Sequence, residues 1–145
     1  MGARSSGREA ALQMLFAIDA GGHDVQAMIL DFWREFPGEA EGRAYADELV
    51  RGVSGDLARA DACIVKASQN WRLERMTRID RNILRVGAWE ILHKSDVPRA
   101  VIIDEAVELA KRYGSENSSA FVNGVLNRIA EDCVPPSGSP ATQGE

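Results

Sequence analysis

Residues 98–128 read PRAVIIDEAVELAKRYGSENSSAFVNGVLNR, and this stretch decides the fold class. At about 100° per residue, its first half places apolar side chains on one side of a helix and charged ones on the other. The apolar side consists of Ile102, Ile103, Ala106, Val107, Leu109, Ala110 and Tyr113. Pro98 suits the first turn of a helix, and Gly114 favours a left-handed C-terminal cap. The pattern predicts a core-facing helix with a solvated back.

A second amphipathic helix is predicted after a short polar turn. The turn, residues 115–118, contains serine and asparagine side chains that can cap a new helix. The apolar positions that follow are Val122, Val125, Leu126 and Ile129, with Phe121 at their edge. The turn thus gathers polar groups, helix-start N–H donors and flanking aromatic rings. Such a combination can receive an anion or a base.

Helical periodicity continues upstream, and no sustained alternation of period two suggests a strand. Residues 1–7 are expected to form a mobile cationic arm, followed by a helix with a Ser6–Glu9 capping box that ends at Gly21–Gly22. Further helices are predicted at residues 25–36, from Ala44 to about Ser68 and from Met76 to Ile91. In the second of these, Gly52 and Gly55 are expected to weaken or bend the helix.

These patterns predict an all-α fold of two packed three-helix bundles, with about seven helices in total. We expect one domain over residues 1–133, divided near Asn70 into N-terminal (1–70) and C-terminal (71–133) helical subdomains. The two must pack together because each alone would bury too little apolar surface. Residues 134–145 are rich in Pro, Ser and Gly, and we expect a disordered tail.

Charge is distributed unevenly along the 145 residues, whose formal net charge is −5. Nine acidic residues face three arginines between Asp19 and Asp56, whereas eight basic residues face four acidic ones between Lys66 and Arg99. The net charge argues against a protein that coats nucleic acid indiscriminately. The clearest basic stripe consists of Arg75, Arg78, Arg81 and Arg85. It is interpreted either as a solvated helix face with ion pairs or as a surface for an acidic partner.

No catalytic constellation is apparent. The two cysteines, Cys63 and Cys133, lack partners at metal-ligand spacing, so we expect reduced thiols and neither a metal site nor a cofactor. Neither His23 nor His93 is spaced to pair with a nucleophile, and no glycine-rich phosphate loop occurs. No apolar run reaches the ~20 residues of a membrane helix, and no signal-peptide core is present. These features favour a cytoplasmic binding protein over an enzyme and predict no membrane association.

Five motifs together resemble the NusB family of bacterial transcription antitermination factors. The motifs are REAALQMLF (Arg8–Phe16), IDRNILR (Ile79–Arg85), DVP (Asp96–Pro98), DEAVELAK (Asp104–Lys111) and FVNGVL (Phe121–Leu126). They occur in order between about Arg8 and Ile129. The resemblance implies two three-helix bundles and a noncatalytic RNA-binding protein. It also implies two kinds of partner: single-stranded boxA-type RNA bound together with NusE, a small-subunit ribosomal protein, and the RNA polymerase antitermination complex.

The resemblance also implies roles for particular residues. The RNA-binding positions would be Arg4, Arg8, Phe16, Tyr113, Asn117, Ser118 and Phe121, and the NusE-binding positions would be Asp80 and Arg81. The N-terminal arm has only two arginines where family members often have a dense cluster, which predicts a weaker electrostatic grip. Phe16 stands where tyrosine is frequent, which keeps stacking but loses a hydroxyl. Asn117 stands where an acid is common, and loss of that charge should favour RNA.

Two alternatives remain at the level of sequence. The chain could be a helical protein-interaction scaffold, or a NusB-like RNA-binding accessory domain acting with a separate RNA-modifying enzyme. The sequence is also compatible with a homodimer, because a face that binds RNA or NusE could be covered by a second copy.

Overall fold

The computed structural model describes residues 2–22, 24–38, 40–69 and 71–133. In these ranges the chain forms α-helices and a short 3₁₀ turn but no strand, which confirms the all-α prediction. The α-helices are α1 (Ala3–Gly21), α2 (Val25–Glu35), α3 (Ala40–Gly55), α4 (Leu57–Ala67), α5 (Arg78–His93), α6 (Arg99–Tyr113) and α7 (Ser118–Asp132). The 3₁₀ turn η1 spans Leu73–Arg75. The predicted disordered tail, residues 134–145, and His23 lie outside the described residues.

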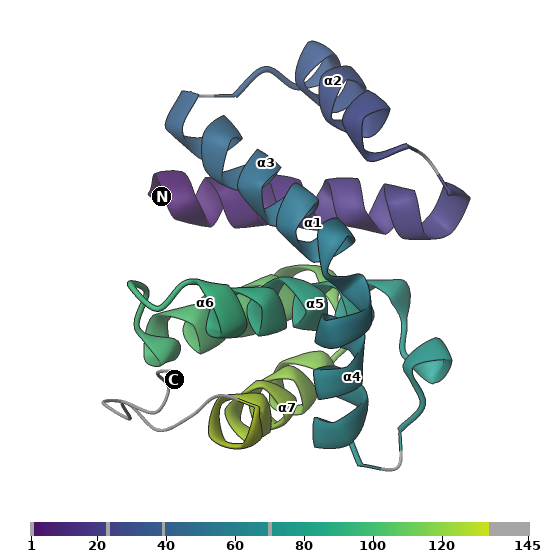
Figure 1. Cartoon of the computed structure of the whole chain (residues 1–145), viewed down its shortest axis with the longest axis vertical. Helices are drawn as coiled ribbons and strands as arrows, with labels where there is room; N and C mark the ends of the chain where they lie inside the picture. The colour runs from purple at the N-terminus through teal and green to yellow at the C-terminus, as the bar shows by residue number, and fades with distance from the viewer. Residues whose placement is uncertain (1, 23, 39, 70, 134–145) are drawn as a thin grey trace, which may run out of the picture.

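The helices form two groups, each with its own apolar core (Figure 1). Helices α1, α2 and α3 surround one core cluster, whereas α4, α5, α6 and α7 surround the other. Two elements link the groups: α5 contributes Val86 and Trp89 to the first cluster, and Leu12 of α1 belongs to the second. The molecule is therefore two packed helical bundles, as predicted.

The boundary between the bundles lies earlier in the chain than Asn70. Ala60 and Ile64 of α4 are fully buried in the second core, so α4 packs with the C-terminal helices. The single long helix expected from Ala44 to Ser68 is wrong, because the chain breaks between α3 and α4 at Gly55–Asp56. Asp56 leaves helical geometry with φ −129° and ψ 35°. The break lets α4 turn away from the first bundle.

Gly52 lies inside α3 and allows that helix to approach α5 closely. A Cβ at Gly52 would lie 2.3 Å from the ring of Trp89. No side chain fits between the α3 backbone and the indole at that separation. The glycine that lowers helix propensity in the sequence thus serves the contact between the bundles.

The expected N-terminal arm is helical from Ala3, and the Ser6–Glu9 capping box does not form. Gly2 is the N-cap residue, and it provides no side-chain cap. Tertiary packing explains the early start: a Cβ at Gly7 would lie 2.9 Å from the carbonyl oxygen of Gly42, so α1 and α3 pack backbone to backbone there. The predicted C-terminal stop is confirmed, with Gly22 in the left-handed region at φ 67°.

A buried ion pair joins the two bundles. Arg8 of α1 donates to both carboxylate oxygens of Glu90 on α5, with Nε–Oε1 at 2.9 Å and an Nη2–Oε2 distance of 2.8 Å. The Tyr45 hydroxyl of α3 donates to the same carboxylate. Burial, together with the bond to Glu90 and its charge, raises the pKa of Tyr45, so the phenol stays protonated and can donate. Three helices thereby converge on one acceptor.

Candidate nucleic-acid interface

The turn between α6 and α7 is held by Ser118. Its side-chain oxygen accepts a hydrogen bond from the backbone N–H of Ser115 at 2.9 Å, and the residue is 2% exposed. The expected left-handed cap at Gly114 is wrong, because Gly114 is extended with φ −93° and ψ −170°. Glycine is needed for space instead: a Cβ there would lie 2.4 Å from Ser118 Oγ and 2.8 Å from the carbonyl oxygen of Ala110.

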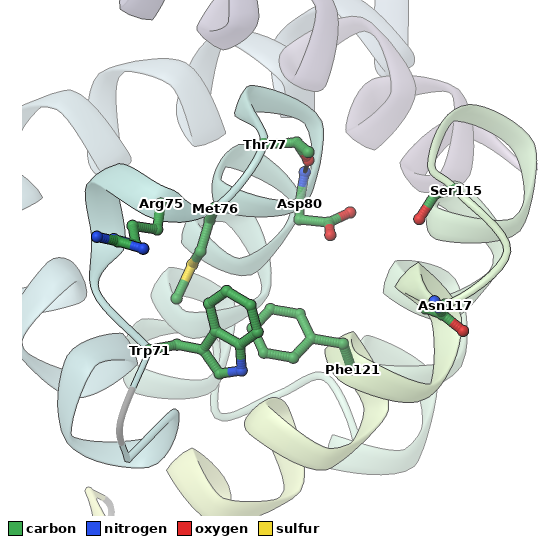
Figure 2. A pocket seen from close by; sticks show the side chains of 8 residues that line it. All are labelled: Trp71, Arg75, Met76, Thr77, Asp80, Ser115, Asn117 and Phe121. Atoms are coloured by element: carbon green, nitrogen blue, oxygen red, sulfur yellow. Dashed lines mark hydrogen bonds between the residues drawn. The ribbon is translucent and has the colours of Figure 1, made fainter.

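A cavity of about 270 Å³ opens beside this turn (Figure 2). Its lining consists of Trp71, Arg75, Met76, Thr77, Asp80, Ser115, Asn117 and Phe121. The rings of Trp71 and Phe121 meet edge to face, with centroids 6.1 Å apart and planes at 69°. Trp71 is 54% exposed, although it is a large apolar side chain. The two rings offer an accessible aromatic surface on which an unpaired base can stack.

Polar groups line the other side of the cavity. Thr77 accepts a hydrogen bond from the backbone N–H of Asp80 at 3.1 Å and so caps α5. Within the described residues, Oδ1 of Asp80 is buried without a hydrogen-bond partner. Asn117 is exposed at the N-cap position of α7 and makes no side-chain capping bond. The cavity therefore presents a free carboxylate acceptor and a free amide next to the aromatic rings.

A second, smaller cavity of about 180 Å³ lies at the end of α6, where it is lined in part by Tyr113. Its lining consists of Leu12, Gln13, Phe16, Ile79 and Tyr113. Phe16 and Tyr113 are each 37% exposed. The Tyr113 hydroxyl donates to Glu9, and this hydrogen bond, with burial, raises the pKa of Tyr113. Ile79 of this cavity and Asp80 of the first follow each other in α5. We call Phe16, Tyr113, Phe121 and Trp71 the aromatic strip.

The two N-terminal arginines do not join the aromatic strip. Arg8 is 3% exposed, and its guanidinium is engaged by Glu90 and lies 3.6 Å from Glu105. This geometry does not favour the expected contact between Arg8 and RNA. Arg4 is exposed, but it lies 3.5 Å from Asp96, which precedes α6, whereas the strip lies where α6 ends. Along α1, Arg4 is separated from Phe16 by about 18 Å at 1.5 Å per residue.

Two of the four arginines in the basic stripe, Arg81 and Arg85 of α5, form internal ion pairs. Arg81 donates to Asp19 at 2.9 Å and to the carbonyl oxygens of Leu73 and Met76. Arg85 likewise pairs with Asp19 and with Asp61, the latter at 2.8 Å. Only the first two arginines of the stripe, Arg75 and Arg78, are exposed. Arg81 therefore acts on the cavity by fixing the loop before α5.

Sequence reasoning missed Trp71 as a site residue. Its signal was an aromatic side chain in a polar connection, where no helical apolar stripe could bury it. Among the described residues, no group of three His, Cys, Asp or Glu side chains is arranged to hold a metal ion. In the same part of the chain, no helix is long and apolar enough to span a membrane.

Comparisons with known proteins agree with this architecture. The sequence model of the NusB family matches residues 5–131. Transcription antitermination protein NusB of Sorangium cellulosum (strain So ce56) is 70% identical over 132 residues, covering 91% of this chain and 94% of that protein.

Solved structures give the same result for the fold. T. maritima NusB has a TM-score of 0.84 and 36% identity, covering 91% of this chain and 93% of that one. A crystal structure of the antitermination factors NusB and NusE in complex with dsRNA contains a chain with a TM-score of 0.83 and 26% identity. That match covers 90% of this chain and 98% of that one.

Proposed function

The chain belongs to the NusB family, and from this we propose that it is a transcription antitermination factor that binds boxA-type RNA together with NusE. The family's antitermination role and the complex of NusB, NusE and dsRNA support the partners. The observation on this chain that carries the proposal is the accessible aromatic strip at the α6–α7 turn. The factor acts with the RNA polymerase antitermination complex, in the cytoplasm where nascent RNA is made, and as a binding protein, not an enzyme.

RNA is bound mainly by stacking and only weakly by charge. The strip offers four rings to unpaired bases, and stacking on aromatic side chains tolerates different bases. The Asn117 amide adds a donor and an acceptor at the start of α7, where backbone N–H groups favour an anion. Exposed Arg75 and Arg4 are available to phosphates. Because the chain carries a net charge of −5, NusE supplies part of the electrostatic attraction.

NusE binds beside the RNA, at Asp80. The unpartnered Oδ1 of Asp80 can accept an N–H bond from NusE, and a buried acceptor gains most from such a bond. Arg81 supports this contact indirectly, because its guanidinium holds the carbonyl oxygens of Leu73 and Met76. RNA and NusE then meet at one cavity, so each partner helps to order the surface used by the other.

The two alternative functions are less well supported. A separate RNA-modifying enzyme is not needed, since the chain matches 94% of the length of an antitermination protein. A scaffold that uses the basic stripe would have to compete with the ion pairs of Arg81 and Arg85.

Alanine substitution of the strip tests the proposal. Trp71→Ala or Phe121→Ala should weaken binding of boxA RNA, measured with NusE present, by about 5- to 150-fold, the equivalent of roughly 1–3 kcal/mol per lost stack. Phe36→Ala is the matched control, because Phe36 is 57% exposed on the other bundle. Equal RNA affinity in Phe36→Ala and both strip variants, with unchanged melting temperatures, would refute the assigned interface.

A further inference from the structure

The two cysteines of the chain meet where α4 packs against the end of α7. Cys63 lies within α4, and Cys133 is the C-cap residue of α7. Both are half-buried and pack against the core of the second bundle. The two thiols lie close enough to influence each other, because the Cys133 thiol is among the groups that raise the pKa of Cys63. They come from distant parts of the sequence, so their meeting is a product of the fold.

The helices that carry the thiols are held in place independently of them. Arg128 of α7 donates to the carbonyl oxygen of Ala67, in the last turn of α4, at 2.8 Å. Ile64, next to Cys63, and Ile129, one turn before Cys133, are fully buried in the same core. Figure 1 shows α4 and α7 side by side in the lower bundle. A bond between the sulfurs would therefore join surfaces that are already packed.

We propose that Cys63 and Cys133 form a reversible disulfide that staples α4 to α7 when the protein meets an oxidising thiol–disulfide couple, such as that of glutathione. One thiolate attacks glutathione disulfide, which forms a mixed disulfide and releases one glutathione. The second thiolate attacks the protein sulfur of the mixed disulfide and releases another glutathione. The protein loses two electrons and two protons, and one glutathione disulfide becomes two glutathione molecules.

The surroundings of the thiols set the order of attack. Burial raises the pKa of Cys63 to about 11, with a further contribution from the Cys133 thiol. Cys63 is therefore protonated near neutral pH, and only thiolates attack. The first attack therefore falls to the other thiol, that of Cys133. Cys63 resolves the mixed disulfide, and its own proton leaves in that step.

Equilibration of the full chain with glutathione buffers of increasing disulfide content tests the proposal. After acid quenching, intact mass and thiol counting should show one two-electron transition to a species with no free thiol and no adduct. The bridge closes a long loop, so the melting temperature should rise by roughly 10 °C. Cys63→Ser and Cys133→Ser should each take up one glutathione without that rise, and Cys63→Ser should react faster.

Three results would overturn the proposed Cys63–Cys133 disulfide. They are accumulation of two glutathione adducts on one chain, persistence of two free thiols at the most oxidising ratio, and a bridge that leaves the melting temperature unchanged. The reduced melting temperatures of Cys63→Ser and Cys133→Ser serve as folding controls. None of these measurements involves RNA, so the result is independent of the proposed antitermination role.

Discussion

At the scale of single residues, the Arg8–Glu90 pair is the most costly interaction to break. Both side chains are nearly inaccessible, so loss of the Glu90 charge leaves the buried guanidinium with only the partly exposed Glu105 carboxylate, 3.6 Å away. We expect Glu90→Gln to lower the free energy of unfolding by about 3–5 kcal/mol, measured by urea denaturation. Asp31→Asn is the control, because its exposed pair with Arg34 should contribute less than about 1 kcal/mol. Similar losses in both variants would contradict the role given to the buried pair.

The ion pairs of Asp19 with Arg81 and Arg85 make the stability of the protein depend on pH. Burial alone would raise the pKa of Asp19. The hydrogen bonds from Arg81 and Asn82 and the positive charges of Arg81 and Arg85 have the opposite and larger effect, so the pKa of Asp19 lies below its ordinary value. The stabilisation is present above the unfolded-state pKa near 4 and is lost as pH falls through the folded-state pKa. Urea denaturation between pH 5 and pH 3 should show a steeper loss of stability in wild type than in Asp19→Asn. Parallel profiles would contradict this account.

Single residues show where sequence reasoning reached its limit. The motif around Arg8 was recognisable, but its partner Glu90 is far away in the sequence, so the burial of Arg8 could not be deduced. The resemblance implied an RNA-binding role for Phe16, and Phe16 is 37% exposed and lines the second cavity. Its contact with RNA stays a prediction.

At the scale of elements, the crossing of α3 and α5 depends on Gly52. A methyl group there would meet the Trp89 ring at 2.3 Å and force the helices apart. We expect Gly52→Ala to destabilise by about 1–3 kcal/mol despite its better helix propensity. At Gly124 of α7, where a Cβ would only reach 3.7 Å from Arg128, alanine should stabilise by up to about 1 kcal/mol. The melting temperatures of Gly52→Ala and Gly124→Ala, compared with that of wild type, test these two expectations. A Gly52→Ala variant as stable as wild type would contradict the close contact between α3 and α5.

The start of α7 gives a prediction about charge. Asn117→Asp places a carboxylate at the N-cap, where it suits the helix but repels a nearby phosphate. RNA affinity should fall roughly fivefold, the equivalent of about 1 kcal/mol between charges near 4 Å in water, while the melting temperature is kept or raised. Fluorescence titrations at two salt concentrations check this, since added salt should shrink the difference. Unchanged or tighter binding would argue against RNA at Asn117.

Helices were predicted better than the breaks between them. The period of apolar residues depends only on local sequence, so α2 and α5 were expected close to where they lie. Gly55 was expected to weaken or bend its helix, and the chain does break at Gly55–Asp56. That α4 becomes a separate helix of the other bundle, and that Gly114 is extended, depends on contacts with other elements, which the local pattern of apolar residues does not contain. The cavity was hidden for the same reason, because Trp71 and Phe121 meet only after α4 and α7 have packed.

At the scale of the whole molecule, the family and the two-bundle architecture expected from five motifs are confirmed. The boundary between the bundles shifted because α4 packs its buried face on the C-terminal helices. The expected site is divided. The aromatic residues and Asn117 lie near the end of α6 and the start of α7, whereas Arg4 of α1 lies near the start of α6, beside Asp96. The aromatic strip carries no basic side chain and the protein has a net charge of −5, which explains why a second protein should be needed for tight RNA binding.

The most direct test of this account is a titration of labelled boxA RNA with the protein, alone and with NusE, against a scrambled RNA. We expect weak binding with a shallow salt dependence by the protein alone, because few basic side chains contact phosphates, and tighter, boxA-selective binding when NusE is present. Binding no stronger than that of the scrambled RNA, both with and without NusE, would contradict the proposed function.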